Sequence, residues 1–230
     1  MNIKIDCVTV GDIQTNCWLY AIGDDPSVPD TKGRPCVVID PGDEAGLIIS
    51  RLRELNWTPR YILLTHGHFD HLAGLPDLLD GWKKVFSSTT AESPKIGIHR
   101  LDAQYLGKDA HSVHRRSFSA VGGNYAYVDA LWKPMPEADI LFEEGDTEGP
   151  FKILHVPGHT QGSVCFYDEK AGILFSGDTM FKGDWGRTDL PGGNESQIQQ
   201  SLKRLRTLKS DTVVCPGHGP PTTIEEETPI

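Results

Sequence analysis

Three histidines and an aspartate lie in one short stretch of this sequence, THGHFDH at residues 65–71. Imidazole nitrogens and carboxylate oxygens are the ligands that zinc and other first-row divalent ions take from proteins. His66 and His68, two positions apart on a turn, can point to the same side, and Asp70 and His71 follow after the chain has turned. The stretch therefore indicates a metal site.

Three further groups of this kind follow short apolar runs later in the chain. His159 comes after FKILHV, Asp178 after GILFS and His218 after TVVC, while the first cluster follows YILLT. Apolar runs rich in β-branched and aromatic residues and bounded by Gly or Pro predict strands. In α/β folds, ligands bind at the carboxyl ends of the strands. We expect these four strand ends to bring their side chains into one cleft.

The number of candidate ligands indicates two metal ions. A hydrolytic site for one ion needs three protein ligands and a position for water, so seven candidates suggest two ions that share a bridge. Asp178 is the only carboxylate among the later groups and is the expected bridge. Zinc is favoured, with iron or manganese as alternatives, because His and Asp accept all three. The expected ligands are His66, His68, Asp70, His71, His159, Asp178 and His218.

The elements that position these groups alternate between strand and helix. CVVID predicts another strand, and DEAGLIISRLRELN at 43–56 predicts a helix. The apolar face of this helix is expected to carry Leu47, Ile48, Leu52 and Leu55. A second helix is expected behind Asn194, with Gln197 placed as in a capping box and an apolar stripe over 198–208. The alternation predicts an α/β layered domain.

Composition narrows the classes of function. The 230 residues carry a formal net charge of -10, which disfavours a nucleic-acid or anionic-membrane binder, because such proteins need a clustered basic surface. No stretch approaches the roughly 18 apolar residues of a membrane span. Five cysteines without a CxxC pair argue against a disulfide framework. We expect one domain over residues 1–230, located in the cytoplasm, as a monomer or homodimer.

The middle of the chain has weak periodicity. From about 85 to 139 it is rich in Gly, Ser, aromatic and charged residues, which is typical of a functional lid or of a surface excursion without chemistry. His111 and His114 within it are a weak signal for a second metal site or a substrate channel. His99 and His155 are instead expected to pack in the structure or to support metal ligands.

The seven candidate ligands, in their order and spacing, resemble the metal-binding signature of the metallo-β-lactamase superfamily. The resemblance covers nearly the whole chain and implies an αββα sandwich of two mixed sheets with helices outside. PGHTQGSVCFY, FSGDTMFKGDWGRTDLPGG and VVCPGHGPPTTI are similar to the glyoxalase II-like group, the hydroxyacylglutathione hydrolases. The implied ligand sets are His66, His68 and His159 for one ion, Asp70, His71 and His218 for the other, and Asp178 between them.

This resemblance implies hydrolysis of a small-molecule thioester, of the S-acylglutathione type or a related acyl-thiol. Two cations that share a water lower its pKa and polarise the carbonyl, and Asp70 is placed to orient the nucleophile and take its proton. A thiolate leaves without a dedicated general acid, because thiol pKa values lie around 8.5. Longer members of the group bind glutathione partly through a helical carboxy-terminal extension that this sequence does not show, so segment 85–139 is the expected cover of the pocket.

Three other interpretations fit the same residues. A persulfide dioxygenase, which also carries the GRTD pattern, would hold one iron on His66, His159 and Asp178. A metal-dependent nuclease is disfavoured by the acidic balance. A metal-binding domain without turnover is disfavoured because structural zinc sites are closed and four-coordinate. Arg187 and Asp189 of GRTD are expected to form a structural ion pair.

Overall fold

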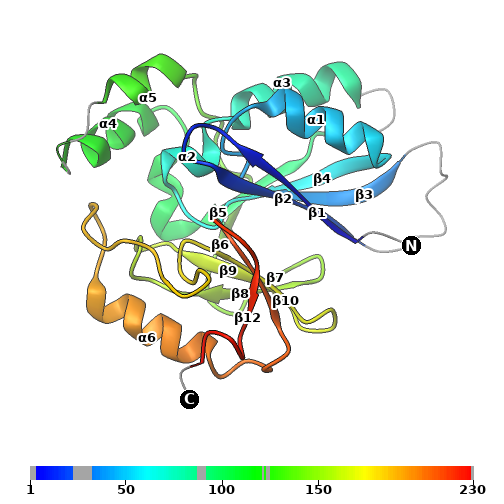
Figure 1. Ribbon diagram of the computed structural model, residues 1–230. Coiled ribbons are helices and arrows are strands. Elements are labelled where there is room, and N and C mark those ends of the chain that lie inside the picture. The colour runs from blue at the N-terminus through cyan, green and yellow to red at the C-terminus, as the bar shows by residue number, and fades with distance from the viewer. Residues whose placement is uncertain (1–3, 23–32, 87–91, 121, 123–124, 229–230) are drawn as a thin grey trace.

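Two six-stranded mixed sheets pack face to face, with helices against their outer faces (Figure 1). The structure is a computed structural model that describes residues 4–22, 33–86, 92–120, 122 and 125–228. This architecture is the αββα sandwich that the family resemblance implies. Among the described residues, no helix has the length and apolarity that crossing a membrane requires.

The first sheet has the order β1-β2-β3-β4-β5-β6. Its strands are β1 Ile5–Val10, β2 Thr15–Ala21, β3 Arg34–Ile39, β4 Trp57–Leu63, β5 Lys95–His99 and β6 Ile140–Phe142. The first three strands pair antiparallel, and β3 through β6 run parallel. Helices α1 (Ala45–Glu54) and α3 (Leu75–Val85) lie over the outer face of this sheet (Figure 1).

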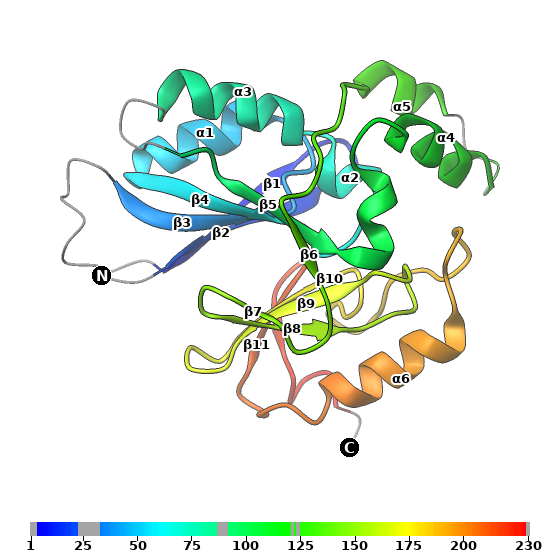
Figure 2. The same cartoon turned by 180° about the vertical axis from the view of Figure 1, so that it is seen from behind.

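The second sheet has the order β12-β11-β10-β9-β8-β7. Its strands are β7 Thr147–Glu148, β8 Phe151–His155, β9 Val164–Asp168, β10 Ile173–Gly177, β11 Val213–Pro216 and β12 Thr222–Thr223. Only β10 and β11 pair in parallel; the other neighbours are antiparallel. Helix α6 (Glu195–Leu205) covers its outer face, as both views show (Figure 2).

Strand β2 shows how the sequence builds the layers. All seven of its residues are buried, and because successive side chains point to opposite faces of a sheet, they divide between two cores. Cys17 and Leu19 pack in the core under α1 and α3, whereas Trp18 and Tyr20 pack in the core between the sheets. A strand that is buried on both faces has apolar side chains at successive positions rather than at every second one.

Both helices expected from the sequence are present, and each differs from the expectation at one residue. Helix α1 buries Ile48 and Leu52, but Leu47 is 51% exposed, because it lies about 100° around the helix from Ile48 and so falls outside the stripe. In α6, the Asn194 side chain accepts a hydrogen bond from the backbone N–H of Gln197 at 3.0 Å. The Gln197 side chain contacts another loop, so the capping box is only half formed.

Segment 85–139 differs from the loop expected there. Its described part holds β5, the 3₁₀ helix η2 (Arg100–Tyr105), α4 (Ala110–Ala120) and α5 (Ala126–Leu131), while residues 87–91, 121, 123 and 124 lie outside the described part. Helix α4 buries Ala110, Val113, His114 and Ser117. This stripe has helical spacing but consists of small or polar side chains, which is why a search for large apolar residues does not detect it.

A buried carboxylate joins the two sheets. Asp168, at the end of β9, accepts hydrogen bonds at Oδ2 from the Tyr20 hydroxyl at 2.6 Å and from Lys4 Nζ at 3.2 Å. Its Oδ1 accepts the backbone N–H groups of Lys170 and Ala171. Burial raises the pKa of Asp168, but these donors outweigh that effect and hold it below its ordinary value. The carboxylate therefore stabilises the folded chain in its charged form.

Replacing Asp168 with alanine is expected to lower the free energy of unfolding by about 3 kcal/mol, because a buried phenol and two amides lose their acceptor. The Tyr20→Phe variant, which removes one donor, should cost about 1 kcal/mol. Since the folded pKa is depressed, the contribution is complete above the unfolded pKa of about 3.9 and is lost as the pH falls through the folded value. Urea titrations at pH 7 and pH 3 check this; equal losses at both would contradict it.

Candidate metal centre

The seven candidate ligands come together at the carboxyl ends of strands from both sheets. His66 follows β4, and His68 is the residue before the one-turn helix α2 (Phe69–Leu72), which carries Asp70 and His71. The remaining three follow strands of the second sheet: His159 after β8, Asp178 after β10 and His218 after β11. The strand ends thus meet in one cleft, as expected.

Buried packing sets the direction of the first cluster. The Phe69 ring is 1% exposed and stacks on Trp132 with centroids 6.3 Å apart, which anchors α2 from behind. Gly217, before His218, allows close approach: a Cβ there would lie 2.2 Å from Asp178 Oδ1 and 2.6 Å from His71 Cε1. Glycine is therefore required where the last loop crosses the site.

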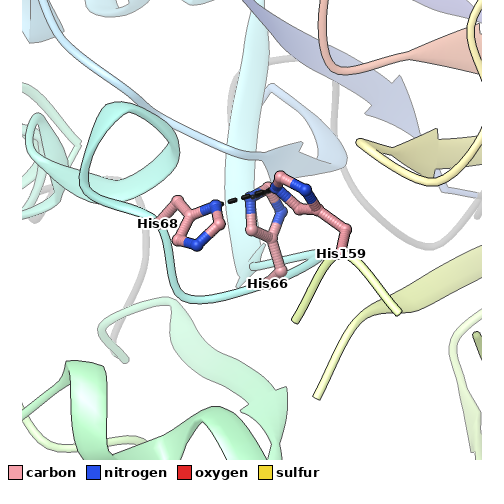
Figure 3. Close-up of side chains that lie close together, drawn as sticks. All are labelled: His66, His68 and His159. Atoms are coloured by element: carbon pink, nitrogen blue, oxygen red, sulfur yellow. Dashed lines mark hydrogen bonds between the residues drawn. The ribbon is translucent and has the colours of Figure 1, made fainter. Parts of the chain in front are cut away.

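Three imidazole rings form the first group, and Figure 3 shows them converging. His159 Nε2 lies 2.8 Å from His68 Nδ1 and 3.2 Å from His66 Nε2. All three side chains are buried. Ligand atoms about 2.0 Å from one tetrahedral ion lie about 3.3 Å apart, so three nitrogens at these distances fit a single ion.

A second group lies beside the first. His71 Nε2 and His218 Nε2 are 3.3 Å apart, and Asp70 Oδ2 lies 3.3 Å from His218 Nε2 and 3.5 Å from His71 Nε2. The Asp70 carboxylate also accepts a hydrogen bond from the Thr15 hydroxyl at 3.3 Å. These three side chains also converge closely enough to hold one ion.

Asp178 lies between the two groups. Its Oδ2 is 3.5 Å from His159 Nε2 in the first group and 3.5 Å from His218 Nε2 in the second. Its buried Oδ1 lies 3.2 Å from His71 Nε2, but without the geometry of a well-formed hydrogen bond. A buried carboxylate oxygen without a donor is costly unless a cation neutralises it. The two clusters therefore fit a dinuclear metal site.

The electrostatics favour carboxylates that stay ionised. Burial raises the pKa of Asp70 and of Asp178, but the surrounding histidines outweigh it and lower both values. Burial lowers the pKa of His66 and of His68 well below the ordinary value, so both rings are neutral at neutral pH. Ionised carboxylates and neutral imidazoles are the forms that bind metals.

His71 has the opposite shift. Burial lowers its pKa, but the carboxylates of Asp178, Asp70 and Asp40 outweigh burial and raise it well above the ordinary value. The pKa of His218 is also raised, because the hydrogen bond that its ring donates to Asp70 and the nearby Asp178 charge outweigh burial. These two rings therefore hold protons that a metal must displace.

Metal binding is accordingly expected to release protons, and the affinity should rise with pH until the pH passes the raised histidine pKa values. Titration calorimetry of the metal-free protein with Zn²⁺, in buffers of different ionisation enthalpy at pH 6, 7 and 8, measures the number released. A proton release near zero at all three pH values would contradict the raised pKa of His71.

Asp40 supports the second group and was missed in the sequence analysis. It follows β3 in VVID, and its Oδ2 lies 2.9 Å from His71 Nδ1. The same carboxylate accepts the Thr65 backbone N–H at 2.8 Å and the Thr65 hydroxyl at 2.6 Å. A carboxylate behind a ligating histidine fixes the tautomer and orientation of the ring. The rule that strand ends deliver functional groups would have found it.

Asp102 joins the two loops that carry the first group, and no sequence signal marked it. Its carboxylate is 1% exposed and accepts the backbone N–H groups of Gly67 and Gly162 and the Thr160 hydroxyl at 2.7–2.9 Å. Gly67 lies between two candidate ligands and Thr160 directly follows a third. Asp102 thus holds the turn of the first sheet against the turn of the second.

The other histidines serve packing and support. His99 and His155 stack with centroids 4.2 Å apart, and His155 Nε2 donates to the Gln161 carbonyl at 2.8 Å. His111 pairs with an aspartate of α5, while His114 Nε2 donates to a backbone carbonyl 3.0 Å away. Each of these two rings thus has a partner within the protein, and among the described residues they belong to no group of metal-competent side chains.

The GRTD segment forms the expected ion pair beside the site. The Arg187 guanidinium donates to both Asp189 oxygens at 2.6 and 2.7 Å. The carbonyl of Arg187 accepts a hydrogen bond from His159 Nδ1 at 2.7 Å, which leaves Nε2 facing the other candidate ligands. The ion pair thus steadies the backbone that orients this histidine.

A cavity of about 520 Å³ opens over both groups. Five candidate ligands form part of its wall, and α4 also contributes to the wall through His114, Ser117 and Phe118, together with Phe181 and Leu190. This volume is within the range of small-molecule sites. The weakly periodic segment therefore contributes to the cover of the cleft.

Comparisons with known proteins identify the family to which the chain belongs. A family model described as the metallo-beta-lactamase superfamily matches residues 10–218. The probable metallo-hydrolase YqgX of Bacillus subtilis is 36% identical over 95% of this chain and 91% of its own length. The hydroxyacylglutathione hydrolase GloC of Haemophilus influenzae is 32% identical over 99% and 95%.

Among solved structures, TTHA1623 in a di-iron-bound form superposes with a TM-score of 0.75 at 33% identity, covering 96% of both chains. Sequence and fold thus agree along nearly the full length of the chain. On these grounds the chain belongs to the metallo-beta-lactamase superfamily.

Proposed function

We propose that this protein is a metal-dependent hydrolase that cleaves a thioester with water. The observation that supports this most directly is the pair of ligand groups with Asp178 between them, on the floor of a cavity sized for a small molecule. The relatives named as a probable metallo-hydrolase and as a hydroxyacylglutathione hydrolase support the same class of reaction.

In this proposal His66, His68 and His159 hold one ion, Asp70, His71 and His218 hold the other, and Asp178 contacts both. When bound, the ions supply a water of lowered pKa and polarise the carbonyl under attack. Zinc is the favoured metal, and iron or manganese remain alternatives, since a relative of this fold is known in a di-iron-bound form.

Asp70 is the proposed catalytic residue beyond its role as a ligand. Its Oδ2 faces two histidines and the Thr15 hydroxyl, and its depressed pKa keeps it ionised and able to accept a hydrogen bond. A carboxylate held there orients the attacking water and takes its proton. The leaving thiolate needs no acid, because thiol pKa values lie around 8.5.

Hydrolysis of S-lactoylglutathione and of other lactoyl thioesters by protein loaded with two equivalents of Zn²⁺ or Fe²⁺ tests the proposal. Steady turnover that a chelator abolishes and added metal restores is expected. An absence of turnover of every thioester by the fully loaded protein would refute it.

Metal content separates this function from the persulfide dioxygenase alternative. Close to two ions per chain in the purified protein supports the dinuclear hydrolase. Close to one iron per chain, with oxygen uptake in the presence of glutathione persulfide, would instead support an iron site made by His66, His159 and Asp178.

A further inference from the structure

The wall of the active-site cavity that faces the ligands is notable for its lack of cations. Among the described residues that line it, Arg187 is the only lysine or arginine, and its Nε and Nη2 both donate to the Asp189 carboxylate. Arg116 of α4 lines a separate, smaller cavity of about 170 Å³ together with Asp102. In the described part of the cavity wall, the one arginine is thus already neutralised by an aspartate, and no other lysine or arginine offers a charge to a substrate carboxylate.

Aromatic and aliphatic groups take the place that cations would need. Phe69, Phe118 and Phe181 line the cavity, with Ile13 and Leu190 at its sides. Phe118 is fixed by stacking on Tyr127, with centroids 5.7 Å apart. A carboxylate placed against these side chains would lose its hydration without gaining a partner.

The polar groups of the cover accept hydrogen bonds. His114 Nε2 donates to the Tyr105 carbonyl, so Nδ1 of the neutral ring keeps its lone pair, and burial lowers the pKa of His114 to about 4. The Ser117 hydroxyl donates to the Val113 carbonyl at 3.2 Å and also shares a hydrogen bond with the Tyr105 hydroxyl, which leaves one lone pair of its oxygen as an acceptor. These groups match a substrate that offers amide N–H or hydroxyl groups and no negative charge.

We infer that the physiological substrate is a thioester of an uncharged, amide-bearing thiol, and that the phenyl ring of Phe118 with the acceptors of α4 selects it over glutathione. S-Acylglutathione carries two carboxylates and one ammonium group, and the chain itself carries a formal net charge of -10, which adds long-range repulsion.

In the reaction, the water oxygen bonds to the acyl carbon, the carbon–sulfur bond breaks, and a carboxylate, a thiol and one proton result.

This inference rests on the proposed thioester hydrolysis, and one experiment separates the two. The metal-loaded protein is given lactoyl thioesters of N-acetylcysteamine, which is neutral, and of glutathione. We expect kcat/KM to be at least about tenfold higher for the neutral ester, because an unpaired charge is costly in an apolar wall. Turnover with an equal or higher kcat/KM for the glutathione ester overturns the inference alone. Turnover of neither ester overturns both.

Variants of Phe118 test the role of the cover. Phe118→Arg supplies a cation and should raise the ratio of kcat/KM for the glutathione ester to kcat/KM for the neutral ester about tenfold or more. Phe118→Met supplies no charge, so this variant should still hydrolyse the neutral ester with the higher kcat/KM. Binding of the thioethers S-hexylglutathione and S-hexyl-N-acetylcysteamine to the natural protein gives a second readout without turnover. The neutral thioether should bind at least about fivefold more tightly; equal affinity, or an unchanged ratio in Phe118→Arg, contradicts the inference.

Discussion

Replacement of Asp178 with alanine is expected to lower kcat/KM for any thioester that the protein hydrolyses by roughly 10²–10³-fold or more, the scale for removing one preorganised electrostatic group from a catalytic site. The Asp178 carboxylate lies within 3.5 Å of histidines of both groups. Without it, five histidines and Asp70 remain, so the negative charge that offsets two cations is halved. The purified variant should therefore hold close to one ion per chain, measured by elemental analysis.

Two further variants make this result specific. Asp178→Asn keeps the shape and one oxygen but loses the charge, so its metal content should fall between those of the natural protein and the alanine variant. Asp80, an exposed aspartate of α3 paired with Lys83, is a matched control, and Asp80→Ala should change neither metal content nor turnover. Full metal content in Asp178→Ala would refute its role as the bridge.

The Asp40→Asn variant is expected to lower metal affinity by about 10–100-fold, the range for a carboxylate that supports a ligating histidine. Asp40 accepts three hydrogen bonds, one from Thr65 N–H at Oδ1 and two at Oδ2 from the Thr65 hydroxyl and His71. An asparagine has only one acceptor oxygen, so either His71 or the Thr65 backbone faces an amide N–H₂ instead.

Competition with a chromophoric chelator measures this affinity for each variant. Asp80→Asn is the control, because this exposed carboxylate of α3 pairs with Lys83 and lies outside both ligand groups, so its metal affinity should stay within about threefold of the natural value. If Asp40→Asn binds metal as tightly as the natural protein, the orientation of His71 does not depend on this carboxylate.

The sequence was most informative where buried strands end. The runs before His66, His159, Asp178 and His218 are strands of the structure because each is apolar, short and closed by Gly or Pro. The same reasoning brought all seven candidate ligands into one cleft. Their roles as metal ligands, and the role of Asp70 in catalysis, stay predictions.

The sequence did not predict residues whose contacts are far away along the chain. Asp102 meets Gly67 and Gly162, which are 35 and 60 residues away, and no local pattern announces such a contact. Helix α4 escaped for another reason: His114 and Ser117 are buried polar residues, and their apolar surroundings come from other elements. The spacing of apolar residues predicts which face of a helix or strand is buried only when that face is itself apolar.

Each ligand group draws residues from both sheets, and this has a consequence for how the protein matures. His68 and His159 are 91 residues apart, and His71 and His218 are 147 apart. Contacts so distant along the chain require closure of long loops, so they form late in folding. We therefore expect a complete ligand set only after the two halves of the chain have docked, so metal binding should require the folded chain. Metal-free protein should accordingly unfold more readily by separation of the two layers, and the cell can load the ions into a chain that is already assembled.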